Sequence, residues 1–368
     1  MKNLTYKGTG VDYDAMDPFK RLAQQAGLRT EMFNPHVYKE VEMSRGESVY
    51  LVDANGRYLA HVEEGLGTKN LVADAMYKLT GKSYYDNIAQ DTVAMIVNDM
   101  ITLGAYPLSV AMHLAVGSGD WFKDEKRSND LITGWEKACN IARCAWGGGE
   151  TPTLKDIIIP DTVVLSGSAI GTVPNRDKLI KCNIQDDDII VMIGSSGIHA
   201  NGLTLARKIA EKLPDGYLTK LPNGRTYGDT LLDPTIIYVP LVEDCIEAGV
   251  DIHYAVNITG HGWRKLMRAS QPFAYILDQS QIEHPRHEIF DFICKHGPVD
   301  IKEAYANFNM GFGFALYVKE KDFMTVCDIA HKLGIYATRG GHIEKSDEKK
   351  VVIPGLGIEY TAETLAVR

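Results

Sequence analysis

The stretch "EEGLGTKN", residues 63–70, joins a predicted strand to a predicted helix. Gly65 and Gly67 can adopt backbone conformations that point N–H groups at an anion. Thr68 adds a hydroxyl, and Lys69 adds a positive charge suited to phosphate. The string lacks the GxxxxGK[ST] spacing of a Walker loop. It therefore has two interpretations, a phosphate-binding loop preceded by acids or a plain turn between two elements.

The sequence on either side predicts the elements that this loop joins. Upstream, "SVYLVDANGRYLAHV" (48–62) predicts a β-hairpin whose turn lies at 53–56. Downstream, "NIAQDTVAMIVNDMITLGA" (87–105) has apolar residues at helical spacing, and Gly104 is expected to end that helix.

This helix carries polar residues among apolar ones. Asp91 and Asn98 are seven positions apart and share a face, and Asp99 lies about 80° further round the helix. Carboxylate and amide oxygens are hard ligands, as magnesium with a nucleotide requires. A solvated acidic face is the alternative, but the apolar neighbours make a metal site the favoured interpretation.

A glycine run precedes another acid in "WGGGETPT" (146–153). It either ends the amphipathic helix predicted for "SNDLITGWEKACNIARCA" (128–145) and leads into a turn, or brings the backbone close to a ligand. In the second case Gly148, Gly149 and Thr151 would contact phosphate. Glu150 would then be a further magnesium ligand.

The second half contains more polar loops that follow predicted strands. "SSGIHANG" (195–202) could hold a phosphate at a helix N-terminus, and His199 within it could transfer a proton or be incidental. "NITGHGW" (257–263) is a similar loop, and "NFNMGFG" (307–313) is either a further glycine-rich site or a tight strand entry. "TIIYVPLVEDCIEAG" (235–249) predicts a helix.

Composition limits the class of protein. The chain has 368 residues, is 45% hydrophobic and carries a net charge of −9, which argues against a nucleic-acid partner. Apolar runs fall short of the roughly 20 residues that span a bilayer, and the start lacks a signal peptide, so we expect a cytoplasmic protein. Both halves mix strands and helices, which predicts an α/β or α+β fold with domains 1–174 and 175–368.

Several strings together resemble one family, aminoimidazole ribonucleotide synthetase, also called phosphoribosylformylglycinamidine cyclo-ligase. They occur in the family's order over nearly the whole chain. They are GTGVDYDAM (8–16), GLGTK (65–69), DTVAMIVNDMITLGAYPL (91–108), GGET (148–151), SSGIHANGLTLARKI (195–209), LLDPTIIYV (231–239), ITGHG (258–262) and FNMGFG (308–313).

The resemblance implies a fold and a reaction. The N-terminal α/β domain would pair with its twin into a barrel-like homodimer core, and the C-terminal α/β domain would complete the cleft. ATP would activate the formyl amide oxygen of formylglycinamidine ribonucleotide, after which a nitrogen closes the imidazole ring and phosphate leaves. The expected ligands are ATP, Mg²⁺ and a small-molecule nucleotide substrate.

The residues and the resemblance together give one candidate site. Catalysis is assigned to Glu64, Lys69, Asp99 and His199. The ATP phosphates are assigned to Gly65, Gly67, Thr68, Lys69, Asn98, Gly148, Gly149 and Thr151. Magnesium is assigned to Asp91, Asp99 and Glu150. The substrate is assigned to Ser195, Ser196, Gly197, Asn201, Thr259, Gly260 and His261.

The sequence departs from the family's pattern at three places. Glu64 stands where the family usually has Asp. His261 replaces a glycine within ITGHG (258–262), and Asn257 replaces a histidine just before that motif. The glycine-rich loop usual upstream is here "TEMFNPHVYKEVEMSRGES" (30–48), with one glycine.

Two alternatives remain open. The first is another ATP-using enzyme of the same superfamily, which includes thiamine monophosphate kinase and the selenophosphate and hydrogenase-maturation enzymes. The second is a non-catalytic paralogue that binds nucleotide.

Overall fold

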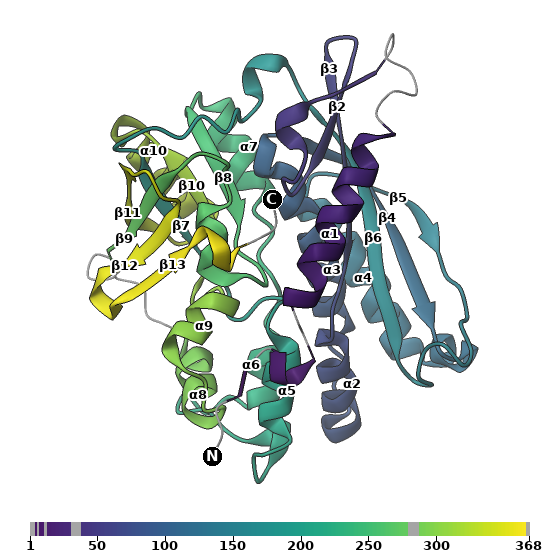
Figure 1. The fold of residues 1–368 in the computed structure, drawn as a ribbon. Coiled ribbons are helices and arrows are strands. Elements are labelled where there is room, and N and C mark those ends of the chain that lie inside the picture. Colours follow the sequence, from purple (N-terminus) through teal and green to yellow (C-terminus); the bar gives the residue numbers. More distant parts are fainter. Residues whose placement is uncertain (1–3, 6, 11–12, 31–37, 279–286, 366–368) are drawn as a thin grey trace.

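The computed structural model describes residues 4–5, 7–10, 13–30, 38–278 and 287–365, and it contains two β-sheets with helices packed around them (Figure 1). This confirms the predicted mixed α/β fold. No helix within the described ranges is both long and apolar enough to cross a membrane.

Six strands from the first half form one sheet. Its order is β1-β2-β3-β6-β4-β5, and all neighbours are antiparallel except β4 and β5. The strands are β1 (Lys39–Glu40), β2 (Tyr50–Ala54), β3 (Arg57–Gly65), β4 (Tyr106–Val116), β5 (Ala145–Glu150) and β6 (Val163–Val173). The helices of this half are α1 (Tyr13–Leu28), α2 (Lys69–Thr80), α3 (Tyr85–Met100) and α4 (Glu125–Ile141).

Seven strands from the second half form the other sheet, in the order β13-β12-β9-β11-β7-β10-β8. They are β7 (Ile189–Gly194), β8 (Ile252–Asn257), β9 (Phe273–Leu277), β10 (Phe312–Val318), β11 (Ala337–Lys345), β12 (Lys350–Ile353) and β13 (Ile358–Thr361). The helices here are α5 (Leu203–Ala210), α6 (Tyr227–Leu231), α7 (Val239–Glu247), α8 (Glu288–His296), α9 (Ile301–Asn307) and α10 (Glu320–Lys332).

Helix α3 lies between the two halves and explains how they are held together (Figure 1). Its apolar side chains other than Met95, among them Val93 and Val97, are fully buried. Its polar side chains bond to the second half. Asn98 accepts a hydrogen bond from the Tyr238 backbone N–H at 2.8 Å and donates to the Ile236 carbonyl at 2.8 Å.

Two local predictions around this core are confirmed. The hairpin forms as β2 and β3, with Asn55 and Gly56 at positive φ in its turn. Helix α3 continues into a short 3₁₀ turn that ends at Gly104, whose left-handed φ of 79° gives the C-cap. Gly104 has to be glycine, because a Cβ there would lie 2.5 Å from the Lys178 carbonyl oxygen.

The interpretation of Gly147–149 as a helix end is wrong. Helix α4 ends at Ile141, Arg143 takes a positive φ of 54°, and the glycines form strand β5 beside β4. Their lack of a side chain serves strand packing, because a Cβ on Gly149 would lie 2.1 Å from the Met112 carbonyl oxygen.

The helix predicted for 235–249 is too long. Helix α7 begins at Val239. The preceding residues stay out of the helix, and their backbone groups bond to α3. Thr235 N–H donates to Asp91 and Tyr238 N–H donates to Asn98, both at 2.8 Å.

The packing of α3 against α4 predicts a sensitive glycine. A Cβ on Gly134 of α4 would lie 2.5 Å from the Asp86 Cα. We expect Gly134→Ala to lower the free energy of unfolding by about 1–3 kcal/mol because the helices must separate. Urea unfolding followed by circular dichroism measures this. Thr133→Ala, at an exposed position one residue earlier, is the control and should leave stability nearly unchanged. Equal stability of the two variants would contradict the close approach.

Candidate active site

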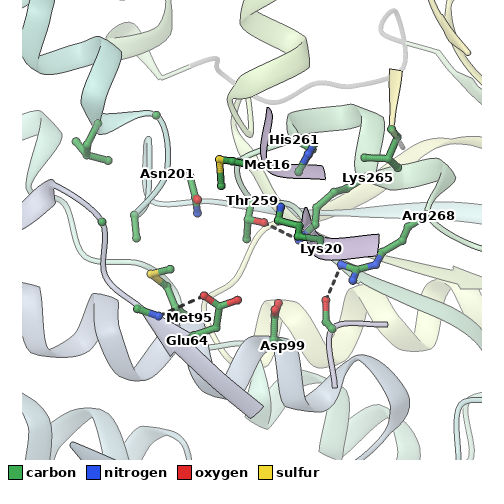
Figure 2. Close-up of a pocket in the computed structure, with 18 of the residues that line it drawn as sticks. Met16, Lys20, Glu64, Met95, Asp99, Asn201, Thr259, His261, Lys265 and Arg268 are labelled. Atoms are coloured by element: carbon green, nitrogen blue, oxygen red, sulfur yellow. Dashed lines mark hydrogen bonds between the residues drawn. The ribbon is translucent and has the colours of Figure 1, made fainter. Parts of the chain in front are cut away.

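A pocket of about 620 Å³ opens between the two halves of the chain. Its walls come from the end of β3, the loop before α2, the C-terminal end of α3 and the loops that precede α5 and follow β8. Helix α1 lies beside it and contributes Met16, Lys20 and Gln24 (Figure 2). The pocket is therefore assembled from segments that are distant in sequence.

Two carboxylates form one wall of the pocket. Glu64 extends from β3 and Asp99 from α3, and Figure 2 shows them near one another. Burial, together with the nearby Asp99 charge, raises the pKa of Glu64 to about 7. Asn257 at the end of β8 donates from Nδ2 to Asp99 Oδ1 at 2.7 Å, which fixes the orientation of that carboxylate.

Cationic side chains lie across the pocket from these acids (Figure 2). Lys265 is 7% exposed, and its Nζ donates to Thr259 Oγ1 at 2.6 Å. Burial lowers the pKa of Lys265 to about 8. The Arg268 guanidinium donates to Ser48 Oγ at 2.9 Å and to the Gly46 carbonyl at 2.8 Å. The pocket can thus bind a cation on one wall and an anion on the other.

His261 also lines the pocket, beside Gly260. Burial and the neighbouring Arg264 and Lys265 charges lower the pKa of its imidazole to about 2. The ring is therefore neutral at physiological pH, and it cannot supply a positive charge to a ligand.

Beneath the pocket lies a second polar cluster, which is fully buried. Lys69 and Asp91 are both 0% exposed, and Lys69 Nζ lies 2.8 Å from Asp91 Oδ2. The same ammonium donates to the Asp233 carbonyl at 2.7 Å. Thr235 donates to Asp91 from its backbone N–H and, at 2.6 Å, from its hydroxyl. Burial raises the pKa of Asp91, while the Lys69 charge opposes that shift.

The loop before α5 bonds mainly to its own surroundings. Ser195 Oγ donates to the Gly197 carbonyl at 2.9 Å, and Ser196 Oγ donates to the Pro234 carbonyl at 2.6 Å. His199 Nε2 accepts from the Ser196 N–H at 3.2 Å. The imidazole is 4% exposed, and burial, followed by the Lys69 charge, lowers its pKa well below the usual range.

The structure therefore separates the predicted site residues into three groups. Those lining the pocket are Glu64, Gly65, Gly67, Thr68, Asp99, Asn201, Thr259, Gly260 and His261. Those outside its lining, in or near the buried cluster, are Lys69, Asp91, Asn98, Ser195, Ser196, Gly197 and His199. Those on or just after the exposed strand β5 are Gly148, Gly149, Glu150 and Thr151, and they also lie outside the pocket lining.

Two models of one protein family match this chain. The N-terminal domain of AIR synthase related proteins matches residues 46–173, and the C-terminal domain matches residues 185–354. The chain belongs to the AIR synthase family. Together the two matches cover both sheets almost completely.

Several curated relatives in the AIR synthase family match over nearly their whole length. The phosphoribosylformylglycinamidine cyclo-ligase of Carboxydothermus hydrogenoformans is 33% identical over 359 residues, covering 96% of this chain and 99% of the relative. The enzyme of the same name from Pyrococcus horikoshii is 34% identical over 349 residues, covering 95% and 98%.

Solved structures with the AIR synthase fold are more distant in sequence. One is AaThiL complexed with AMPPCP and TMP, with a TM-score of 0.63, 13% identity and coverage of 95% and 97%. Another is a HypE–HypF complex, with a TM-score of 0.62, 17% identity and coverage of 92% and 99%. At these identities they support the fold alone.

The residues that depart from the family's pattern gather at the pocket. Glu64 and His261 line it, and Asn257 holds Asp99. Much of the altered upstream loop, residues 31–37, lies outside the described residues, but Gly46, Glu47 and Ser48 at its end reach the pocket.

Sequence reasoning missed the cationic wall. Lys265 and Arg268 are three positions apart and come shortly after "ITGHG" (258–262), so their spacing on a helical turn was a usable signal. Met16, Lys20 and Gln24 likewise repeat every four residues on one face of α1. Nothing in a single sequence indicated which cleft these faces would meet.

The buried ion pair predicts a specific loss of stability. Lys69→Met leaves the Asp91 carboxylate buried without its counter-charge, which should cost about 3–5 kcal/mol. The double variant Lys69→Met/Asp91→Asn should recover much of that loss. Lys78→Met, at an exposed position on α2, is the control. Chemical unfolding of the wild type and the three variants measures the free energy of unfolding. A stable Lys69→Met that has lost ATP binding would instead support the predicted phosphate contact.

Proposed function

We propose that this chain is a phosphoribosylformylglycinamidine cyclo-ligase. It uses ATP to convert formylglycinamidine ribonucleotide to aminoimidazole ribonucleotide, ADP and phosphate in purine biosynthesis in the cytoplasm. The observation that carries the proposal is the near full-length similarity, at 32–34% identity, to several relatives that bear this name.

The pocket supports the part of this proposal that concerns binding of ATP and the ribonucleotide. ATP and a ribonucleotide both carry phosphates, and the Lys265–Arg268 wall offers donors to them. AaThiL was solved with the nucleotide analogue AMPPCP and a HypE with ATP, so related folds bind such ligands. Gly65 and Gly67 leave the backbone at the pocket mouth uncovered by side chains.

Magnesium fits the acidic wall. Among the described residues no three His, Cys, Asp or Glu side chains converge to form a complete metal site. Mg²⁺ is often held by one or two carboxylates together with substrate phosphates, which matches Glu64 and Asp99. When bound, the ion would neutralise phosphate charge. Asn257 would keep one Asp99 oxygen engaged and present the other to the pocket.

In this proposal the chain's own groups orient the reactants. Asp99 and Glu64 would hold Mg²⁺ beside the phosphoryl group that passes from ATP to the formyl oxygen, and the ion would neutralise part of its charge. An amidine nitrogen then attacks the activated carbon, the ring closes, and the oxygen leaves as phosphate. Incubation with formylglycinamidine ribonucleotide, ATP and Mg²⁺ tests this. Equimolar ADP, phosphate and aminoimidazole ribonucleotide are expected, and ADP without the aminoimidazole product would reject it.

A second candidate is an ATP-using enzyme of the same fold with another small-molecule substrate. The observation that favours it is that Glu64 and His261, which depart from the family's pattern, both line the pocket. Stimulation of ADP release by a different phosphorylated metabolite, without activity on formylglycinamidine ribonucleotide, would select this candidate.

The acidic wall predicts the effect of charge removal. Asp99→Asn should lower turnover by about 100-fold or more, because losing one anionic ligand would weaken Mg²⁺ binding and leave the phosphate charge uncompensated. It should raise the Mg²⁺ concentration needed for half-maximal rate. Glu64→Gln should be more damaging than Glu64→Asp. Asp86→Asn, exposed on the same helix, is the control. Circular dichroism checks the fold, and wild-type turnover by a folded Asp99→Asn would contradict the role.

We also propose that the protein is a homodimer through its first sheet. Helix α3 covers one face of that sheet. On the other face Leu59, Val164 and Ile170 are 44%, 49% and 57% exposed. These side chains lie on neighbouring strands β3 and β6, and a second copy could bury them.

Ile170→Glu should therefore give a monomer, because a charge would be buried in the contact. Light scattering of the full chain at micromolar concentration measures this. Met324→Glu, at an exposed position on α10 of the other half, is the control and should stay dimeric. A wild-type chain that is monomeric under these conditions would overturn the homodimer.

A further inference from the structure

Lys265 is a buried ammonium whose hydrogen bonding is incomplete. An ammonium has three N–H donors. Among the described residues, Thr259 Oγ1 is its one hydrogen-bond acceptor, at 2.6 Å. The side chain is 7% exposed and lines the pocket, into which it points in Figure 2. A buried charge with unused donors is costly unless a ligand completes them.

The nearby acids do not take up these donors. Asp99 Oδ1 accepts from Asn257 Nδ2, and Glu64 Oε2 accepts from the Gly65 N–H. Both carboxylates act on Lys265 through their charge. They therefore stabilise the ammonium from across the pocket and leave its donors directed at the space between.

Arg268 is fixed beside this ammonium. Its two terminal nitrogens are held by Ser48 Oγ and the Gly46 carbonyl, and Nε lies 3.6 Å from a Glu47 carboxylate oxygen. A guanidinium held in this way keeps its position without a ligand, so less conformational entropy is lost when one binds. An ammonium, a guanidinium and the Thr259 hydroxyl together suit a phosphate group.

The loop at 195–202, predicted from sequence to hold a phosphate, reaches the pocket only through its last residues, Ala200, Asn201 and Gly202. The hydroxyls of Ser195 and Ser196 donate to backbone carbonyls of Gly197 and Pro234. Neither serine lines the pocket. The two serine hydroxyls are therefore engaged outside the pocket, whereas Lys265 lines it.

We propose that Lys265, supported by Arg268 and Thr259, anchors a phosphate-binding subsite in this pocket. The assignment of that phosphate to the ribonucleotide substrate rests on the proposed function. The recognition chemistry is the same for a phosphomonoester and for the phosphates of ATP, so the test separates the two sources.

Calorimetry of the full chain with two probes tests the subsite. Ribose 5-phosphate represents the substrate's phosphomonoester, and a non-hydrolysable ATP analogue with Mg²⁺ represents the nucleotide. Lys265→Met should weaken one probe or both by about tenfold or more, the scale of a lost charged hydrogen bond, and Lys265→Arg should weaken it less. Lys265→Gln is measured alongside so that the test stands if the methionine variant does not fold.

The control is Lys345→Met, which removes the same charge from a side chain that is 81% exposed and lies outside the pocket. Weakening of ribose 5-phosphate assigns the subsite to the substrate, and weakening of the ATP analogue alone assigns it to the nucleotide. Unchanged affinity for both probes, or no binding of either by the unmodified protein, overturns the proposal. A Lys265 effect in a protein that fails to make aminoimidazole ribonucleotide would reject the proposed function and keep the subsite.

Discussion

The buried ion pair between Lys69 and Asp91 is the constraint on which the arrangement of the two halves depends. A carboxylate at 0% exposure must be neutralised or fully hydrogen-bonded, and Asp91 receives both the Lys69 ammonium and two donors from Thr235. Those donors come from the second half of the chain. Lys69 in turn donates to the Asp233 carbonyl, so the segment 233–235 is held from two sides. Folding of the first half alone would leave Asp91 without the two Thr235 donors and Lys69 without the Asp233 carbonyl.

Helix α3, which carries Asp91, also connects the second half of the chain to the pocket. Asp91, Asn98 and Asp99 of α3 bond in turn to Thr235, Tyr238 and Asn257. The contacts of Asp91 and Asn98 are buried away from the pocket, whereas the contact of Asp99 lies at the pocket wall. Asp99 therefore contributes in two ways. One of its oxygens joins the halves through Asn257, and the carboxylate also lines the pocket. The position of Asp99 in the acidic wall is thus a consequence of how the halves are joined.

The sequence predicted the elements well where the pattern is local, and the site poorly where it depends on distant partners. The hairpin at 48–62 and the end of α3 at Gly104 follow from turn chemistry that acts over a few residues. The glycines at 147–149 were misread, because their reason is the close approach of β4 across the sheet. Lys69 was expected at phosphate since it follows a glycine loop, and its pairing with a residue 22 positions later has no local signature. Lys265 and Arg268 have a helical spacing, but the sequence did not indicate which cleft that spacing would face.

The two walls of the pocket also constrain one another. The charges of Glu64 and Asp99 stabilise the Lys265 ammonium, and the ammonium lowers the pKa of Glu64 against its burial. A cation bound to the carboxylates would offset their negative charge. The Lys265 ammonium would then be less stable unless an anion bound beside it. A phosphate bound to Lys265 alone brings negative charge towards two acids. At the proposed sites each ligand would therefore relieve the repulsion that the other would meet, so a divalent cation and a phosphate would bind more favourably together than either would alone.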